Sequence, residues 1–89
     1  MPVISMFYGL IIMMYYFDNR QHHTPHIHVK FGEFEAVYGI YEGNLLEGEL
    51  PKTKHKLVMA WIEIHKEELI ANWELAVNGT EIFRIEPLK

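Results

Sequence analysis

A glycine-centred turn between two strand-like segments constrains the fold of this chain more than any other feature. Residues 26–31 and 34–41 flank Gly32-Glu33. Glycine in the first central position is typical of a two-residue type II′ hairpin, and such a turn sets the register of both strands. Since strand side chains alternate between faces, we predict one apolar core face and one face that carries histidines. The predicted pairs are Phe31 with Phe34, Val29 with Ala36 and Ile27 with Tyr38 on the core face, and Lys30 with Glu35, His28 with Val37 and His26 with Gly39 on the other.

The next connection places a carboxylate near these histidines. We predict a three-residue loop at residues 42–44, because a two-residue loop would turn glutamates of the following strand into the core. In that register Glu47 lies beside Gly39, whose other neighbour is His26. Gly39, which has no side chain, would then lie between His26 and Glu47. The backbones of these two residues would be about 9.5 Å apart, twice the usual strand spacing.

Leu10–Phe17 is predicted to be a strand that is apolar on both faces. One small helical layer covers only one face of a sheet. We therefore expect this strand either to lie in the core or to form a self-association surface, which would make the protein a homodimer.

The second half of the chain is predicted to be helical. Residues 52–78 have apolar positions three and four apart, and the polar run 65–68 either lies within one long helix or divides it into two. Glu81–Glu86 is predicted to be a short final strand. The expected fold class is α+β: an antiparallel β-meander of about four to five strands packed against one long or two shorter C-terminal helices, in a single domain over residues 1–89.

Composition narrows the function and the location. The formal net charge is −4 and the chain has no cysteine, so we expect no disulfide and no whole-protein attraction to a nucleic-acid backbone. The longest apolar run, Met6–Phe17, is too short to span a bilayer, and no basic region precedes it. We expect a cytoplasmic protein without membrane contact.

Four of the six histidines lie in the seven-residue segment 22–28. Histidine titrates near neutral pH and is the commonest metal ligand, so His23, His26 and His28 are candidate catalytic residues. With Glu47 they also form a candidate site for zinc, nickel or iron(II). The alternative is that His26 and His28 are simply exposed strand residues and that the preceding histidines lie on a loop.

A second candidate is a cluster of basic residues at the start of the helical half. Lys52, Lys54 and Lys56 could contact an anion or a nucleic-acid phosphate beside the histidines. A solvated helix start is the favoured interpretation, because charge runs usually face solvent. Trp61 and Trp73, twelve residues apart, are predicted to be core residues rather than base-stacking platforms.

Several separated motifs carry a resemblance to a known family, the small bacterial proteins called domain of unknown function 4160. Thr24 stands where that family usually has a second proline, and Met6 where a basic residue is common. The resemblance implies a gene in a two-gene unit of the toxin–antitoxin type, whose partner is a small protein encoded by the neighbouring gene. It implies no role for any residue. The motifs are Met-Pro-Val-Ile-Ser at residues 1–5, Met-Tyr-Tyr-Phe-Asp-Asn at 14–19, His23-x-Pro25-His26-x-His28-Val29, Glu47-Gly48-Glu49-Leu50-Pro51 and Glu68-Leu69-x-x-Asn72-Trp73.

Three functions remain open at this point, and the residues do not decide whether the chain is an enzyme. The leading hypothesis is a toxin-like or regulatory member of a two-gene unit, acting through the histidine-bearing surface on an RNA, nucleotide or protein target. The second is a metal-binding protein or metal-dependent hydrolase. The third is a non-catalytic protein-interaction domain.

Overall fold

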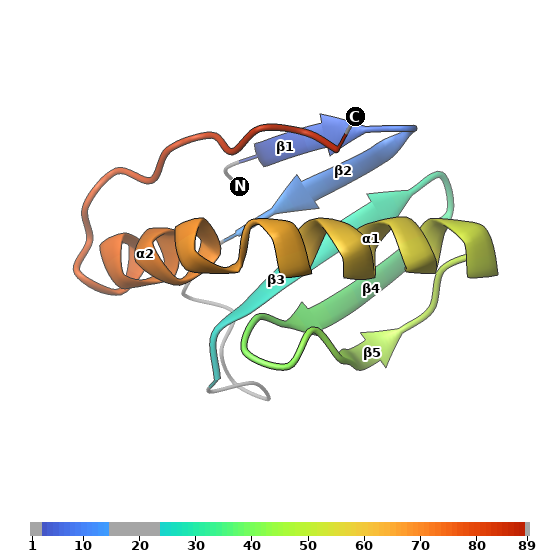
Figure 1. Cartoon of the computed structure of the whole chain (residues 1–89), viewed down its shortest axis with the longest axis horizontal. Helices are drawn as coiled ribbons and strands as arrows, with labels where there is room; N and C mark the ends of the chain where they lie inside the picture. Colours follow the sequence, from blue (N-terminus) through green and yellow to red (C-terminus); the bar gives the residue numbers. More distant parts are fainter. Residues whose placement is uncertain (1–2, 15–23, 89) are drawn as a thin grey trace.

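The computed structural model describes residues 3–14 and 24–88. Five antiparallel strands form one sheet in the order β1-β2-β3-β4-β5, and two helices follow the last strand, as predicted for an α+β meander (Figure 1). Among the described residues, no helix is long and apolar enough to cross a membrane. The elements are β1 (Val3–Phe7), β2 (Leu10–Met13), β3 (His26–Phe31), β4 (Phe34–Gly39), β5 (Leu45–Gly48), α1 (Lys52–Ile64) and α2 (Lys66–Val77).

The β3–β4 hairpin confirms the predicted register. All six predicted pairs are present, from Phe31 opposite Phe34 to His26 opposite Gly39. Gly32 has a φ of +56° whereas Glu33 has a negative φ, which is the type II′ pattern. The two-residue turn and the apolar alternation therefore agree on which side chains enter the core.

Strand β1 was not among the individually predicted strands. It pairs with β2 through a turn at Tyr8-Gly9, where φ is +51° and +81°, the pattern of a type I′ turn. A register irregularity between Val3 and Ser5 interrupts the regular alternation of β1. Of the predicted strand Leu10–Phe17, β2 ends at Met13, and Tyr15–Phe17 lie outside the described residues.

The predicted three-residue loop between β4 and β5 is wrong. The chain leaves β4 at Gly39, Ile40 turns into the core, and the backbone N–H of Gly39 donates to the carbonyl of Asn44. Five residues therefore join the strands, and Glu47 lies opposite Val37 instead of Gly39. A Cβ on Gly39 would lie 2.8 Å from the Asn44 side-chain oxygen. The Asn44 side chain therefore fills the space at Gly39 that was predicted to lie between a histidine and a carboxylate.

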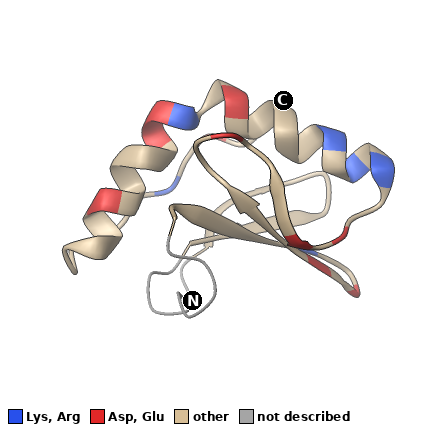
Figure 2. Cartoon of the chain, turned by 90° about the horizontal axis from the view of Figure 1, so that it is seen from below, with Lys and Arg blue, Asp and Glu red and all other residues tan. Residues whose placement is uncertain are grey.

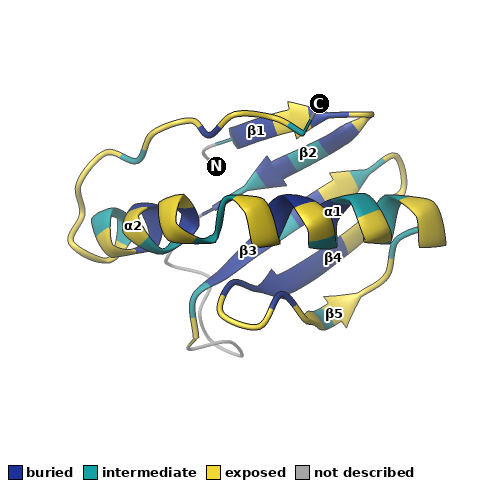
Figure 3. Cartoon of the chain, in the orientation of Figure 1, coloured by how far each residue is buried: buried dark blue, intermediate teal, exposed yellow. Residues whose placement is uncertain are grey.

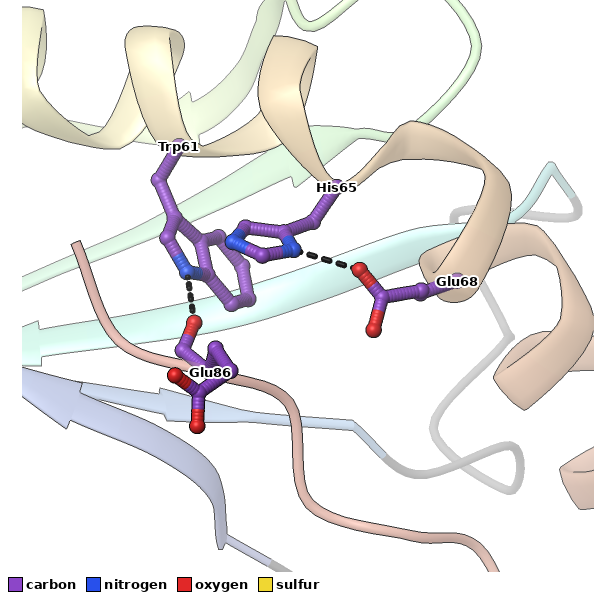
Figure 4. Close-up of polar contacts among 4 residues, drawn as sticks. All are labelled: Trp61, His65, Glu68 and Glu86. Atoms are coloured by element: carbon purple, nitrogen blue, oxygen red, sulfur yellow. Dashed lines mark hydrogen bonds and ion pairs between the residues drawn. The ribbon is translucent and has the colours of Figure 1, made fainter.

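The helical half is divided into two helices at His65, within the polar run where a break was one of two predictions. His65 donates from Nδ1 to Glu68 Oε1 across 2.5 Å, and its ring lies against Trp61 (Figure 4). Helix α1 lies over one face of the sheet, and α2 then bends away beyond the end of the sheet (Figure 2). The buried residues of the two helices are Val58, Trp61, Ile62, Leu69, Asn72 and Trp73.

The prediction of a strand at Glu81–Glu86 is also wrong. This segment runs alongside β1 without regular structure (Figure 1), and the Ile85 N–H donates to the Ile4 carbonyl. Side chains of the helices satisfy other backbone groups of this segment. The buried Asn72 amide bonds both the N–H and the carbonyl of Phe83, and Trp61 Nε1 donates to the Glu86 carbonyl (Figure 4). These partners replace a strand ladder.

The core lies between the sheet and α1 (Figure 3). Leu10, Ile12 and Met14 are fully buried there, whereas Ile11 and Met13 are half-buried on the opposite face. The apolar β2 segment thus serves both faces, but only one of them is closed by a helix.

Candidate functional site

The sheet face opposite α1, called the back face below, carries two rows of side chains across the strands. Strand pairing aligns the side chains of each row. Each row is apolar on β1 or β2, carries lysine or histidine on β3, and ends in a carboxylate on β4 or β5. The first row is Met6, Ile11, Lys30 and Glu35, and the second is Met13, His28, Val37 and Glu47.

A partly open hollow of about 290 Å³ lies on this face. Val37 and Met13 contribute apolar surface to it, His28 and Lys30 come from β3, and Glu47 closes it from β5. Lys30, Glu35 and Glu47 are exposed. The hollow therefore offers apolar, cationic and anionic groups together within the reach of one ligand or partner surface.

Gly48 allows β5 to approach β4 closely beside this hollow. Its φ is +77°, and a Cβ at this position would lie 2.1 Å from the Glu35 carbonyl oxygen. The next residue, Glu49, donates its backbone N–H to that same carbonyl. A glycine at this position is therefore required by the backbone that presents Glu47.

The two strand histidines that were predicted to act together are neighbours in the structure but differ in burial. Both project from one side of β3, with ring centroids 5.3 Å apart. His26, however, is fully buried, and its ring lies 5.0 Å from that of Trp73 in α2. The prediction that both histidines lie opposite the helical cover is wrong for His26, which is on the predicted side of β3 but packs against α2, because the bend at His65 carries α2 past the sheet end.

His26 is held in one orientation by its backbone contact. Its Nδ1 lies 2.8 Å from the Thr24 carbonyl oxygen, and since a carbonyl only accepts, Nδ1 must carry the proton. This bond and the Trp73 ring give His26 a role in joining β3 to α2.

His28 is the strand histidine that contributes to the open face. It is half-buried, lines the hollow and lies opposite Val37, whose other neighbour is Glu47. The histidine and the carboxylate are thus two strands apart, as predicted for His26 and Glu47, but on the neighbouring row.

The metal and catalytic predictions depend partly on His23, which lies outside the described residues. Within residues 3–14 and 24–88, no group of three His, Cys, Asp or Glu side chains is placed to hold a metal ion. A site made of His23, His26, His28 and Glu47 stays a prediction. Elemental analysis of protein purified without chelators or an affinity tag is the direct test.

The three lysines at the start of α1 do not act as one group. Lys54 donates to the Tyr8 carbonyl across 2.9 Å, and its ammonium lies 5.0 Å from the Phe31 ring centroid. It therefore stabilises the β1–β2 turn. Lys52 and Lys56 are exposed, and anion binding by them stays a prediction.

A tyrosine–histidine pair under α1 was not singled out from the sequence. The buried Tyr38 hydroxyl lies 2.7 Å from His55 Nδ1, and the two rings are stacked. Burial raises the pKa of Tyr38 to about 12, and the hydroxyl and the imidazole nitrogen share a hydrogen bond. The pair fixes the first turns of α1 on β4.

Back-face residues were also missed, for two different reasons. Lys30 and Glu35 were placed on this face by the hairpin register but were not proposed as site residues. Met6 was missed because β1 was not predicted. It is 54% exposed, and only its pairing with Ile11 shows that it extends the back face.

The fold and this open, mixed-polarity face define a small α+β protein whose candidate site is a sheet surface. The family model described as a domain of unknown function (DUF4160) matches residues 9–74, well over half of the chain, and the protein belongs to that family. The resemblance seen in the motifs is confirmed. No curated protein and no solved structure matches the chain.

Proposed function

We propose that this protein is the regulatory or toxin-like member of a two-gene toxin–antitoxin-type unit, and that it acts by binding the small protein encoded by the neighbouring gene. The back face is the binding surface. The proposal places the protein in the cytoplasm. It joins the leading hypothesis from the sequence with the interaction-domain hypothesis.

The observation that carries this proposal is the form of the back face. It is a partly open surface with apolar, cationic and anionic groups in neighbouring rows. Protein interfaces combine apolar and polar groups on one open surface, whereas small-molecule sites usually enclose most of their ligand. Exposed carboxylates at Glu35 and Glu47 favour a protein target over a nucleic-acid backbone.

Coexpression with the neighbouring gene product tests the proposal. The back-face variant is Lys30→Ala with Glu35→Ala. Its matched control is Lys66→Ala with Glu63→Ala, which removes one lysine and one glutamate from an ion pair on the helices. The net charge is the same in both double variants, so a difference between them reports position.

The expected result is a complex with the wild type and the control, and at least about tenfold weaker binding by the back-face variant, the effect of about 1.4 kcal/mol. Induction without the partner should slow growth if the chain is the toxin-like member. Failure of the wild type to bind the partner, or equal binding by both variants, would contradict the proposal.

A further inference from the structure

Apolar side chains lie at one side of the back face and carboxylates at the other, and this order restricts what can bind there. Along the first row, Met6 and Ile11 on the β1–β2 side are followed by Lys30, and then by Glu35 on the β4 side. A partner covering this row must therefore present apolar groups at one side and groups that suit a carboxylate at the other.

The far side of this face is predominantly acidic. Four exposed glutamates lie in the β3–β4 turn, on β4, on β5 and directly after β5, whereas Lys30 is the exposed cation on the neighbouring strand. Figure 2 shows acidic segments on the sheet, while the basic start of α1 lies in the helical layer above it. The charge complement of this side is a cationic segment. The four glutamates are Glu33, Glu35, Glu47 and Glu49.

The spacing of the two sides matches the width of a helix. Ile11 and Glu35 lie on strands two apart, which is about 9.6 Å at the usual strand spacing. An α-helix with its side chains is about 10–12 Å across. A helix lying along β2 and β3 could place an apolar stripe on Ile11 and Met13 and direct side chains of one flank to Glu35.

The existing fold already shows how this sheet accepts a helix. Helix α1 covers the opposite face with an apolar stripe that includes Val58, Trp61 and Ile62. A second helix on the back face would complete a three-layer arrangement, a common solution for a sheet with apolar groups on both faces.

We infer that the occupant of the back face is an amphipathic helix with an apolar stripe and a basic flank, presented by a partner protein. The apolar stripe lies against Met6, Ile11 and Met13, and the basic flank contacts Glu35 and Glu47. This inference rests on the proposed function and adds the chemistry of the partner segment.

Two synthetic peptides of about 18 residues, long enough for five helical turns, serve as probes. The basic peptide has leucine at helical spacings of three and four and lysine elsewhere, and the acidic peptide has glutamate in place of lysine. Each is labelled with a fluorophore and titrated with the full chain, with binding read by fluorescence anisotropy.

The decisive variant is Glu35→Lys with Glu47→Lys. The control is Glu67→Lys with Glu74→Lys, which reverses two exposed charges on α2. Both variants change the formal net charge from −4 to 0, because each reversal adds two charges. A thermal melt of each variant establishes that the fold is retained.

The basic peptide is expected to bind the wild type, to bind the control within about threefold of it, and to lose at least about tenfold affinity for the back-face variant. Met6→Ser should also weaken binding, without a change in charge. Equal loss in both charge variants would mean non-specific attraction, and preference for the acidic peptide would reverse the assignment. Sedimentation showing that the chain pairs with itself through these residues would also overturn it.

These outcomes are distinct from those of the coexpression test. In one outcome the neighbouring protein binds through Lys30 and Glu35, while Glu35→Lys with Glu47→Lys weakens peptide binding no more than its control variant does. In that case the proposed function stands and this inference fails. If the basic peptide binds at the back face while the neighbouring protein does not bind, the proposed function alone fails.

Discussion

The two faces of the sheet are made by the same strands but carry different constraints. Ile12, Val29 and Tyr38 face α1 and are at most 1% exposed. One residue along the same strands, Ile11 is half-buried and Lys30 is exposed. A substitution under α1 therefore changes packing and stability, whereas one on the back face changes the surface that the protein exposes.

His26 is an exception to this division between a buried face and an open face, and it marks the end of the open face. His26 belongs to the back-face side of β3 but is fully buried against Trp73. Its neighbour two residues later, His28, lines the open hollow. The back face is thus available over the middle of the sheet and closed by α2 at one end.

The largest effect is expected under α1. Trp61 is fully buried and donates to the Glu86 carbonyl, whereas Ile64, in the same last turn of α1, is 64% exposed. Trp61→Ala should lower the free energy of unfolding by about 3–5 kcal/mol, and Ile64→Ala by less than about 0.5 kcal/mol. Urea unfolding followed by circular dichroism measures both. Similar losses would mean that α1 does not close this face.

Substitution of Gly48 tests the close approach of β5 to β4 at the edge of the back face. Gly48→Ala meets both a left-handed backbone and the Glu35 carbonyl, whereas Gly32→Ala meets a left-handed backbone with open space around it. The strain at Gly32 should cost about 1–2 kcal/mol, and overpacking at Gly48 should add about 1–3 kcal/mol. Equal destabilisation in thermal melts would contradict the close approach of β5 to β4.

Alanine substitutions of the two strand histidines should affect different properties, stability for His26 and partner binding for His28. His26→Ala removes a buried ring and its bond to the Thr24 carbonyl, and should cost about 2–3 kcal/mol by analogy with other large-to-small core changes. His28→Ala should cost less than about 1 kcal/mol and weaken partner binding. Paired melting and binding measurements on each variant check this. A stable His26→Ala protein would place His26 on the open face.

A pH-dependent effect is expected under α1 at alkaline pH. The pKa of Tyr38 is raised from 10.0 to about 12 by burial, so between these values the unfolded chain releases a proton that the folded chain retains. This contribution to stability is complete below pH 10 and is lost as pH rises towards 12. Wild-type Tm should therefore fall more steeply than that of Tyr38→Phe across this range. Parallel slopes would show that Tyr38 titrates normally.

The sequence predicted the β3–β4 face assignment because local rules agree there. Gly32 specifies the turn, and the apolar alternation of both strands selects the same register. Nothing tertiary opposes either signal. The break within the polar run 65–68 was also among the predicted alternatives.

The sequence predictions that failed depended on contacts between distant segments. Ile40 lengthens the β4–β5 loop because it enters the core, which moves Glu47 by two positions relative to β4. His26 is buried because α2 bends at His65. Residues 81–86 are not a strand because Asn72 and Trp61 bond their backbone. None of these partners can be inferred from local pattern.

Methionine oxidation tests the central claim most directly, because it reports on both faces in one experiment. Met6 and Met13 lie on the back face, and Met59 is half-buried on α1. The chain is treated with hydrogen peroxide alone and in complex with the neighbouring gene product, and sulfoxide formation at each methionine is followed by mass spectrometry. We expect complex formation to slow oxidation of Met6 and Met13 at least about fivefold, because the partner excludes peroxide from the covered thioethers. The oxidation rate of Met59 should not change. Protection of Met59 with no change at Met6 and Met13 would contradict the account.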